Sequence, residues 1–267
     1  MIANIPLIVS GTSGLTDNDA LQLTILHQVP KTTGRNDWRV VEEEVLWQPS
    51  ETAIIIVDMW NKHWSWGATE RVDIMAPRMN AVINTARDRG IQIIHAPSDT
   101  MDFYDGHPAR AWVLDVPHVE MPDPIEHPDP PQPVDSSDGG SDTGEENGYK
   151  AWHRQHSAIE IKDEDAISDN GQEVYNVLKQ KGIKNLLYMG VHTNMCVLGR
   201  SFAIKAMVQS GQFNVALVRD LTDAMYNPFK PPYVSHEEGT QLIIAYIEKF
   251  WCPTITSDDL TANSPTS

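Results

Sequence analysis

Three residues that are far apart in the chain could together carry out nucleophilic catalysis. Cys196 offers a thiol, Asp58 a carboxylate and Lys162 an ammonium group. A cysteine attacks as a thiolate, and a helix N-terminus, a neighbouring ammonium group and a carboxylate that takes the proton all promote that form. Lys162 would also keep a buried Asp58 ionised. These residue types therefore predict a nucleophile, a base and a cation.

Each of these residues also has an ordinary structural interpretation. A free cysteine is often a small buried hydrophobic residue, Asp58 could cap the following turn, and Lys162 could be solvated. Cys252 is interpreted as structural. A redox protein that uses Cys196 alone is disfavoured, because the chain has no C-x-x-C pair and Cys252 is 56 residues away. A non-catalytic binding module is a further alternative.

Hydrophobic patterns indicate the elements that must position these residues. Asp58 follows an apolar, β-branched run that is typical of a strand buried on both faces, and Cys196 begins a helix after another such run. Ser235 and Glu238 form a capping-box motif before the last helix. The predicted strands cover residues 53–57, 91–95, 158–162, 186–190 and 214–218, and the helices cover about 72–86, 169–182, 196 onward and 235–250.

Five β runs that alternate with helices predict a parallel sheet with helices on both faces. In such a sheet ligands bind at the edge formed by the carboxyl ends of the strands. Lys162 ends the predicted strand 158–162, so it is expected to meet Asp58 and Cys196 at that edge.

Two further segments flank or interrupt this pattern. Residues 21–29 and 38–47 are β-rich and joined by turn residues, which predicts a hairpin. Residues 115–149 hold ten acidic residues, seven prolines and no Lys or Arg, which predicts an insertion that is either solvated or a lid over the site. The predicted division is a hairpin extension at 1–51, an α/β domain at 52–255 that carries the insertion, and a tail at 256–267.

Composition narrows the class of partner. The chain has 37 acidic and 20 basic residues, a net charge of −17, which disfavours nucleic acid and anionic membranes as partners. No stretch approaches the roughly 18–20 apolar residues of a membrane span, and the N-terminus lacks the basic region of a secretory signal. Two cysteines cannot form a disulfide framework. We expect a soluble cytoplasmic protein that acts on a small molecule.

Around the three residues the sequence resembles the isochorismatase-like cysteine hydrolases, a superfamily that includes nicotinamidases and ureide and carbamoyl amidases. The resemblance rests on the order Asp, Lys, Cys and on the motifs IIIVDMWN at 54–61 and LYMGVHTNMCV at 187–197. It covers about residues 52–250. It implies a Rossmann-like, three-layer α/β/α sandwich with a mostly parallel six-stranded sheet, and a homo-oligomer.

The resemblance also implies a mechanism, in which Asp58 accepts a proton, Cys196 attacks and Lys162 supports the charges. The backbone N–H groups of His192 and Cys196 would form the oxyanion hole, with a cis peptide bond before His192. A C–N bond of a small amide, ureide or carbamoyl compound would break through a thioester. Hydrolysis of a vinyl ether, as by isochorismatase itself, is the alternative, but it needs no cysteine.

Departures from the family pattern concern the pocket wall. Trp60 stands where the family often has Gln, and His63 stands where it often has an aromatic residue. With Trp64, these residues are predicted to shape the substrate pocket, although aromatic residues packed under a loop are an equal interpretation. The changed wall favours an amide other than nicotinamide.

The resemblance also indicates where a metal site would lie in the sequence. Nicotinamidases carry an Asp-x-His metal site, and the matching stretch here begins at Asp99 and lacks the histidine. Other side chains nearby could form an oxygen and nitrogen cluster, but such side chains are more often solvated. These are Asp102, Asp105 and His107, and the pair His153 and His156. We predict no required metal and no cofactor.

Overall fold

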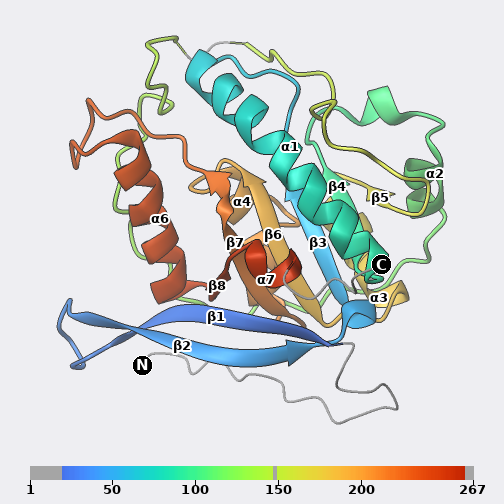
Figure 1. Cartoon of the computed structure of the whole chain (residues 1–267), viewed down its shortest axis with the longest axis horizontal. Coiled ribbons are helices and arrows are strands. Elements are labelled where there is room, and N and C mark those ends of the chain that lie inside the picture. Colours follow the sequence, from blue (N-terminus) through green and yellow to red (C-terminus); the bar gives the residue numbers. More distant parts are fainter. Residues whose placement is uncertain (1–19, 147–148, 262–267) are drawn as a thin grey trace.

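The computed structural model describes residues 20–146 and 149–261, which are built around one eight-stranded sheet (Figure 1). Its order is β2-β1-β8-β7-β6-β3-β4-β5. The strands are β1 (Leu21–Pro30), β2 (Trp38–Trp47), β3 (Thr52–Val57), β4 (Gln92–Ala96), β5 (Ala166–Ile167), β6 (Asn185–Val191), β7 (Asn214–Asp223) and β8 (Thr254–Ile255). The helices are α1 (Trp66–Asp88), α2 (Pro108–Leu114), α3 (Gly171–Gln180), α4 (Cys196–Gly199), α5 (Ile204–Gln209), α6 (His236–Phe250) and α7 (Asp258–Thr261).

The mostly parallel α/β sheet confirms the predicted fold class. The neighbouring strands from β5 to β8 all pair in parallel, which makes six parallel strands. The predicted hairpin, β1 with β2, is antiparallel and joins this sheet where Leu26 pairs with Thr254 of β8. The sheet therefore has eight strands, because the hairpin extends it instead of standing apart.

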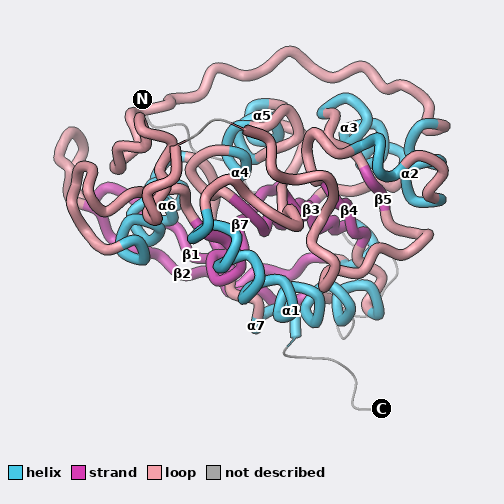
Figure 2. The backbone as a smooth tube through the Cα atoms, turned by 90° about the horizontal axis from the view of Figure 1, so that it is seen from above, coloured by secondary structure: helices cyan, strands magenta, loops and turns pink. Residues whose placement is uncertain are grey.

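Helices cover both faces of the sheet because β3 is apolar on both of its sides. Ile54 and Ile56 belong to the hydrophobic cluster that contains α1 and α7. Ala53, Ile55 and Val57 belong to the cluster that contains α2 to α6. Figure 2 shows α1 and α7 on one side of the strands and α3, α4 and α5 on the other. The predicted three layers are confirmed.

The predicted strand at 158–162 is wrong. The strand in this region is β5, which pairs with β4 through Ile94 and His95. Before β5 the chain makes a turn in which the Lys162 backbone N–H donates to Asp165 Oδ2 at 2.7 Å. The same carboxylate binds Arg87 and His95, so this turn is fixed by side chains that a hydrophobic pattern does not report.

The acidic segment is anchored to the domain along its described part, residues 115–146. Ile125 donates a backbone hydrogen bond to Gln209 of α5, and Asp129 binds Lys205 of the same helix. Val134 is buried in the core, and Gln132 Nε2 donates to the Asn194 carbonyl at 2.8 Å. The segment forms a long loop past α5 toward α6 (Figure 2). The described part of the acidic segment is therefore not fully solvated.

A charged cluster fastens the end of this segment next to the C-terminal edge of the sheet. Arg71 of α1 binds Asp142 and Asp223, each at 2.8 Å. His236 Nε2 lies 2.9 Å from the other oxygen of Asp223. Asp223 ends β7, and its carbonyl accepts from the Thr193 N–H at 2.9 Å. We call these four residues, Arg71, Asp142, Asp223 and His236, the Arg71 cluster.

The C-terminal end of the described chain is partly helical. The predicted tail at 256–267 contains α7, whose Leu260 is fully buried against the face that α1 covers. Residues 1–19 of the predicted extension and 262–267 of the predicted tail lie outside the described residues. Among the described helices, none has the length and apolar character needed to cross a membrane.

Candidate active site

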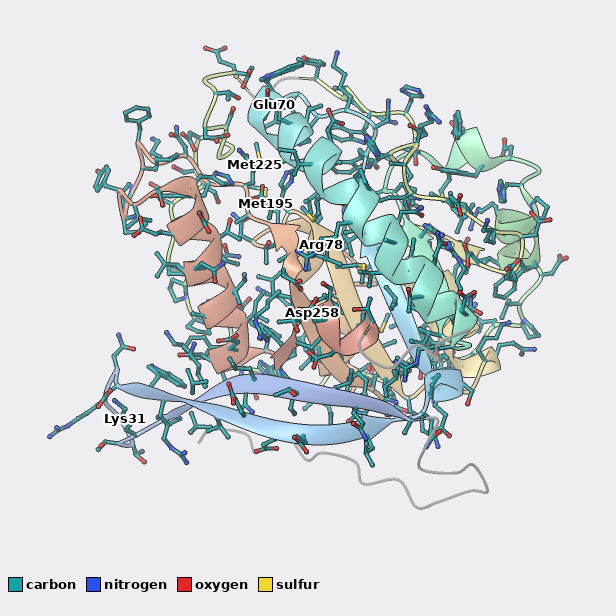
Figure 3. All side chains as sticks on the ribbon, viewed as in Figure 1. Lys31, Glu70, Arg78, Met195, Met225 and Asp258 are labelled. Carbon is teal, nitrogen blue, oxygen red and sulfur yellow. The ribbon has the colours of Figure 1, made fainter. Side chains whose placement is uncertain are left out.

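Asp58 and Cys196 lie together because their strands are neighbours in the sheet. β3 and β6 pair with Val57 opposite Gly190. A Cβ on Gly190, whose φ is +116°, would lie 2.0 Å from the Val57 carbonyl oxygen, so this close approach requires glycine. Asp58 follows β3, and Cys196 begins α4 after β6. Figure 3 labels Met195, the residue before Cys196, beyond the C-terminal ends of β6 and β7.

The Asp58 carboxylate is fully buried and has partners on both oxygens. Its Oδ1 accepts from the Ser98 N–H at 2.7 Å, and its Oδ2 accepts from Arg200 Nε at 3.0 Å. The Cys196 thiol lies beside this carboxylate, and each of the two groups shifts the pKa of the other. The predicted base and the predicted nucleophile are therefore neighbours.

The resting nucleophile is a thiol, contrary to the expectation of a promoted thiolate. Burial, and then the negative charge of Asp58, raises the pKa of Cys196 to about 12. The charge of Arg200 and a hydrogen bond from the His192 N–H act in the opposite direction but are weaker. Burial also raises the pKa of Asp58, against the charge of Arg200. Attack thus requires the proton to move from sulfur to the carboxylate.

Two backbone N–H groups beside the sulfur could stabilise an oxyanion. The predicted cis peptide bond between Val191 and His192 is present. Within the described chain, neither the His192 nor the Cys196 N–H donates to a backbone carbonyl. The His192 N–H faces the Cys196 sulfur, and Cys196 is the first residue of α4. Both predicted donors therefore lie next to the nucleophile, and their role as an oxyanion hole stays a prediction.

Lys162 does not reach this site, which corrects the prediction for its position. Its side chain is 46% exposed, and its ammonium lies 3.0 Å from Glu160. The turn that contains Lys162 precedes β5 and is bound to Arg87 near the C-terminal end of α1, where β4 starts. Lys162 therefore lies near the N-terminal ends of the parallel strands, whereas Asp58 lies at their C-terminal ends. Sequence analysis missed Arg200, which lies four residues after Cys196.

Two of the three predicted pocket residues belong to an aromatic cluster next to the site. Trp60 donates from Nε1 to the Ser98 carbonyl at 3.0 Å and stacks on Trp152 at 4.2 Å between ring centroids. His63 stacks on Trp152 at 5.5 Å and meets the edge of the His192 ring at 5.0 Å. Trp152 was missed because its stacking partner Trp60 is 92 positions away in the chain. The pocket role of this cluster is still a prediction.

The third predicted residue, Trp64, packs in a small hydrophobic cluster of its own beside the aromatic cluster. It is 7% exposed and packs in a small cluster with Ala68 and Met225, against which Met195 and Trp152 also pack. Trp64 touches His63 at 5.0 Å between ring centroids. It therefore contacts the aromatic cluster through His63, and its own cluster packs against Met195, the residue that precedes the nucleophile.

The two imidazoles of the aromatic cluster are neutral at physiological pH. Burial lowers the pKa of His63 to about 3 and that of His192 to about 4. His192 Nε2 is buried without a hydrogen-bond partner in the described structure. The aromatic wall beside Cys196 therefore carries no charge, although Arg200 lies nearby.

The candidate metal ligands do not form a metal site. The Asp99 carboxylate lies 3.6 Å from Arg200 Nη2, and His107 Nδ1 accepts from the Ala109 N–H at the start of α2. His153 contacts Asn61, and His156 contacts Asp73. No group of three or more His, Cys, Asp or Glu side chains among the described residues could hold a metal ion. The residues at Asp99 do not fit the metal site of nicotinamidases.

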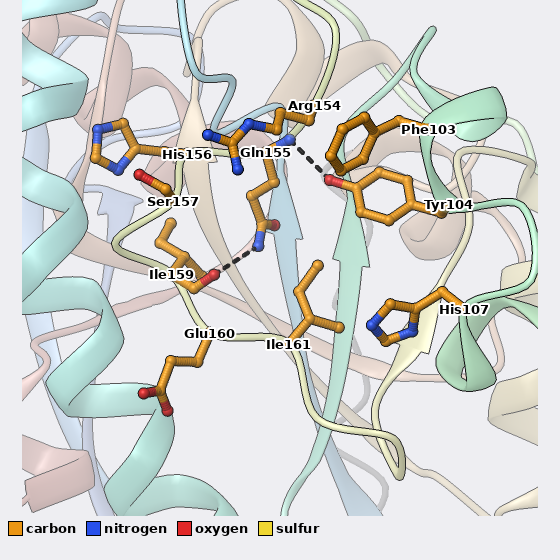
Figure 4. Close-up of a pocket in the computed structure, with 10 residues that line it drawn as sticks. All are labelled: Phe103, Tyr104, His107, Arg154, Gln155, His156, Ser157, Ile159, Glu160 and Ile161. Carbon is orange, nitrogen blue, oxygen red and sulfur yellow. Dashed lines mark hydrogen bonds between the residues drawn. The ribbon is translucent and has the colours of Figure 1, made fainter.

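A cavity of about 290 Å³ lies beside the segment 154–161 (Figure 4). Gln155 crosses its wall, where it bonds to the Tyr104 hydroxyl and the Ile159 carbonyl. The lining does not include Asp58, Cys196 or Arg200. This cavity is therefore separate from the candidate active site.

Comparisons with known proteins find one matching family model and several similar solved structures. The sequence model of the isochorismatase domain matches residues 52–231. The structure is similar to a cysteine hydrolase from Pseudomonas syringae pv. phaseolicola, with 17% identity, a TM-score of 0.48, and coverage of 81% of this chain and 96% of that one. An isochorismatase-like hydrolase from Alkaliphilus metalliredigens has 16% identity and a TM-score of 0.47, with coverage of 80% of this chain and 96% of that one. A pyrazinamidase of Pyrococcus horikoshii in complex with zinc has 17% identity and a TM-score of 0.40, with coverage of 72% of this chain and 94% of that one. No curated protein matches the chain.

Proposed function

The chain belongs to the isochorismatase domain family, and from that premise we propose that it is a cysteine hydrolase that cleaves a C–N bond of a small amide, ureide or carbamoyl compound. One observation carries the proposal: the Cys196 thiol lies beside the buried Asp58 carboxylate, at the C-terminal ends of two neighbouring strands. A nucleophile and a base in contact are what acyl transfer requires. Hydrolysis of a vinyl ether would make no use of the thiol.

In the first half of the reaction, Cys196 Sγ attacks the substrate carbonyl carbon while its proton moves to Asp58. The carbonyl oxygen gains the negative charge, and the N–H groups of His192 and Cys196 stabilise it. The C–N bond then breaks, and the leaving nitrogen takes the proton from Asp58. The products of this half are ammonia or an amine and an acyl group bound to sulfur as a thioester.

In the second half, water attacks the thioester and gives a proton to Asp58. The C–S bond breaks, the sulfur recovers the proton, and a carboxylic or carbamic acid is released. Asp58 thus acts as a base and an acid in each half, which requires its carboxylate to be ionised at rest. The Arg200 ion pair supports that state.

The neutral wall beside Cys196 supports an uncharged reacting group. Trp60, Trp152 and the neutral His63 stack on one another in an uncharged aromatic cluster, and aromatic surroundings suit a planar amide or ureide. The buried Nε2 of His192 offers a hydrogen bond to a polar atom of the ligand. Nicotinamide is disfavoured, since Asp99 faces Arg200 and the metal ligand set is incomplete.

We further propose that the enzyme is a cytoplasmic homo-oligomer. Both cysteines are free, which agrees with a reducing compartment. Light scattering coupled to size-exclusion chromatography measures the mass directly, and a mass near that of one 29.9 kDa chain contradicts the oligomer.

The proposed reaction is tested with a panel of small primary amides, ureides and carbamoyl compounds, together with isochorismate. Ammonia release from the nitrogen compounds and loss of isochorismate are each measured with wild type and with Cys196→Ala. Release that depends on Cys196, and an acyl adduct on the Cys196 peptide after acid quenching, support the proposal. Turnover of isochorismate that persists in Cys196→Ala contradicts it and favours the vinyl ether reaction.

A further inference from the structure

We propose that Arg200 is the positioning cation of the Asp58 and Cys196 pair, the role that the family resemblance assigns to Lys162. This inference rests on the proposed function and names the residue that keeps its base ionised. It follows from three observations: the contact of Arg200 with Asp58, its attachment to the turn that carries Cys196, and the position of Lys162.

The first observation is the ion pair itself. Arg200 Nε lies 3.0 Å from Asp58 Oδ2, and the Asp58 side chain is completely shielded from solvent. A buried carboxylate is strongly disfavoured as an ion unless a cation or several hydrogen bonds compensate it. Ser98 supplies one hydrogen bond to the other oxygen, and Arg200 is the cation that contacts Asp58 among the described residues.

The second observation is that Arg200 and Cys196 share one helical turn. The Arg200 N–H donates to the Cys196 carbonyl at 3.1 Å, directly after α4. Asp99 lies 3.6 Å from the outer edge of the guanidinium and limits its orientations. The Asp99 N–H is in turn bound to Asp169 Oδ2 at 2.8 Å. The cation therefore keeps a fixed position relative to the nucleophile.

The third observation concerns Lys162, whose ammonium pairs with Glu160 on an exposed turn. No interaction connects it with Asp58 or Cys196 in the part of the chain that the structure describes. Lys162 thus provides a matched control: it is a cation that the sequence places in the site and the structure does not.

The chemical consequence concerns the charge of the base. Arginine stays protonated at every pH at which the protein is folded, whereas a lysine loses its proton more readily when buried. Arg200 therefore keeps Asp58 able to accept the thiol proton despite its burial. The groups that act on the thiol are Asp58 and Arg200, with Asp99 on the outer side of Arg200 and the neutral His63 and His192 nearby.

The test uses the rate constant for alkylation of Cys196 by iodoacetamide, measured by peptide mass spectrometry between pH 7 and 10. The variants are Arg200→Met, Arg200→Lys and the control Lys162→Met. Removing a cation in contact with the pair raises the thiol pKa by about one unit or more, so Arg200→Met is expected to slow labelling at least ~10-fold. Arg200→Lys is expected to recover part of the rate, and Lys162→Met to stay within about twofold of wild type.

Arg200→Met leaves Asp58 buried without a counter-ion, so this variant could fail to fold. Asp58→Asn and Asp58→Asn/Arg200→Met avoid that problem, because neither carries the unpaired carboxylate. The double variant is expected to label about 10-fold more slowly than Asp58→Asn. Labelling of the buried Cys252 in each protein reports any general loosening of the fold.

Two results would overturn the proposal. One is an equal labelling rate for Asp58→Asn and Asp58→Asn/Arg200→Met, and the other is a slowing by Lys162→Met as large as that by Arg200→Met. Labelling needs no substrate, so the two hypotheses are tested separately. A charge effect of Arg200 without ammonia release from any amide contradicts the proposed function alone. Ammonia release that depends on Cys196, without a charge effect of Arg200, contradicts the present inference alone.

Discussion

The Cys196 thiol lies beside the carboxylate of Asp58, a residue 138 positions earlier in the chain. The two meet because β3 and β6 are neighbours and Gly190 lets the strands approach closely. The contact has opposite effects on the two steps of catalysis. It holds the sulfur as an unreactive thiol at rest, and it provides the base that removes the proton when a substrate arrives.

Cys196→Ala is expected to reduce turnover to below about 1% of wild type, because the attacking atom is lost. The fold should be retained, since the side chain contributes little to the core. Cys252→Ala, which changes a buried cysteine away from the site, is the control and should keep its turnover. Ammonia release and thermal melting check both variants. Residual turnover of Cys196→Ala well above 1% removes Cys196 as nucleophile.

Asp58→Asn is expected to lower turnover by ~10²–10⁴-fold, because an amide cannot accept the thiol proton. Its size is close to that of the native residue, so substrate binding should change less than turnover. Steady-state kinetics with an amide identified in the panel measures both effects. A loss of less than about threefold rejects Asp58 as the base.

The stability of the protein should depend on the charge of His236. Despite its burial, the hydrogen bond and charge of Asp223 raise the pKa of His236 in the folded protein. The resulting stabilisation is complete below the unfolded pKa of ~6.5 and is lost as the pH rises through the higher folded value. Stability should therefore fall with rising pH in that window, by at most ~1.4 kcal/mol per pH unit for one proton.

The matching measurement is the urea midpoint of wild type and His236→Gln between pH 5.5 and 8.5. The variant should lack this part of the pH dependence. His236 belongs to the Arg71 cluster, in which Asp142 fastens the acidic segment, so its charge should affect the free energy of unfolding. Identical pH profiles for the two proteins contradict the proposed contribution of His236.

Metal removal should leave turnover unchanged. The Asp99 carboxylate faces Arg200, and His107 accepts a backbone hydrogen bond at the start of α2. Dialysis against a chelator, followed by the ammonia assay with and without added zinc, checks this expectation. Activity that disappears on dialysis and returns with zinc shows that the ligand set has been misjudged.

The sequence predicted the fold well where burial is uniform. β3 and β6 are apolar on both faces, and their pattern located the edge at which Asp58 and Cys196 meet. The capping box of Ser235 and Glu238 is present at the start of α6. These features depend on residues that are close together in the chain.

The cation was mispredicted because its identity depends on contacts between distant segments. Apolar and polar residues alternate at 158–162, which is typical of a strand, but a hydrogen bond to Asp165 holds this region in a turn. Arg200 carries no motif, and only the turn after α4 directs it to Asp58. Trp152 was missed for a similar reason, since its neighbour Trp60 is 92 positions away.

The most direct test of the account compares Cys196 alkylation by iodoacetamide in wild type and in Asp58→Asn at pH 7 to 9. Burial, and then the negative charge of Asp58, raises the thiol pKa, so removal of that charge beside Arg200 should lower the pKa and speed labelling by at least ~10-fold. The buried Cys252 serves as the internal reference. Faster labelling together with slower hydrolysis is the predicted result. Unchanged or slower labelling of Cys196 contradicts the coupling of thiol and carboxylate on which the mechanism depends.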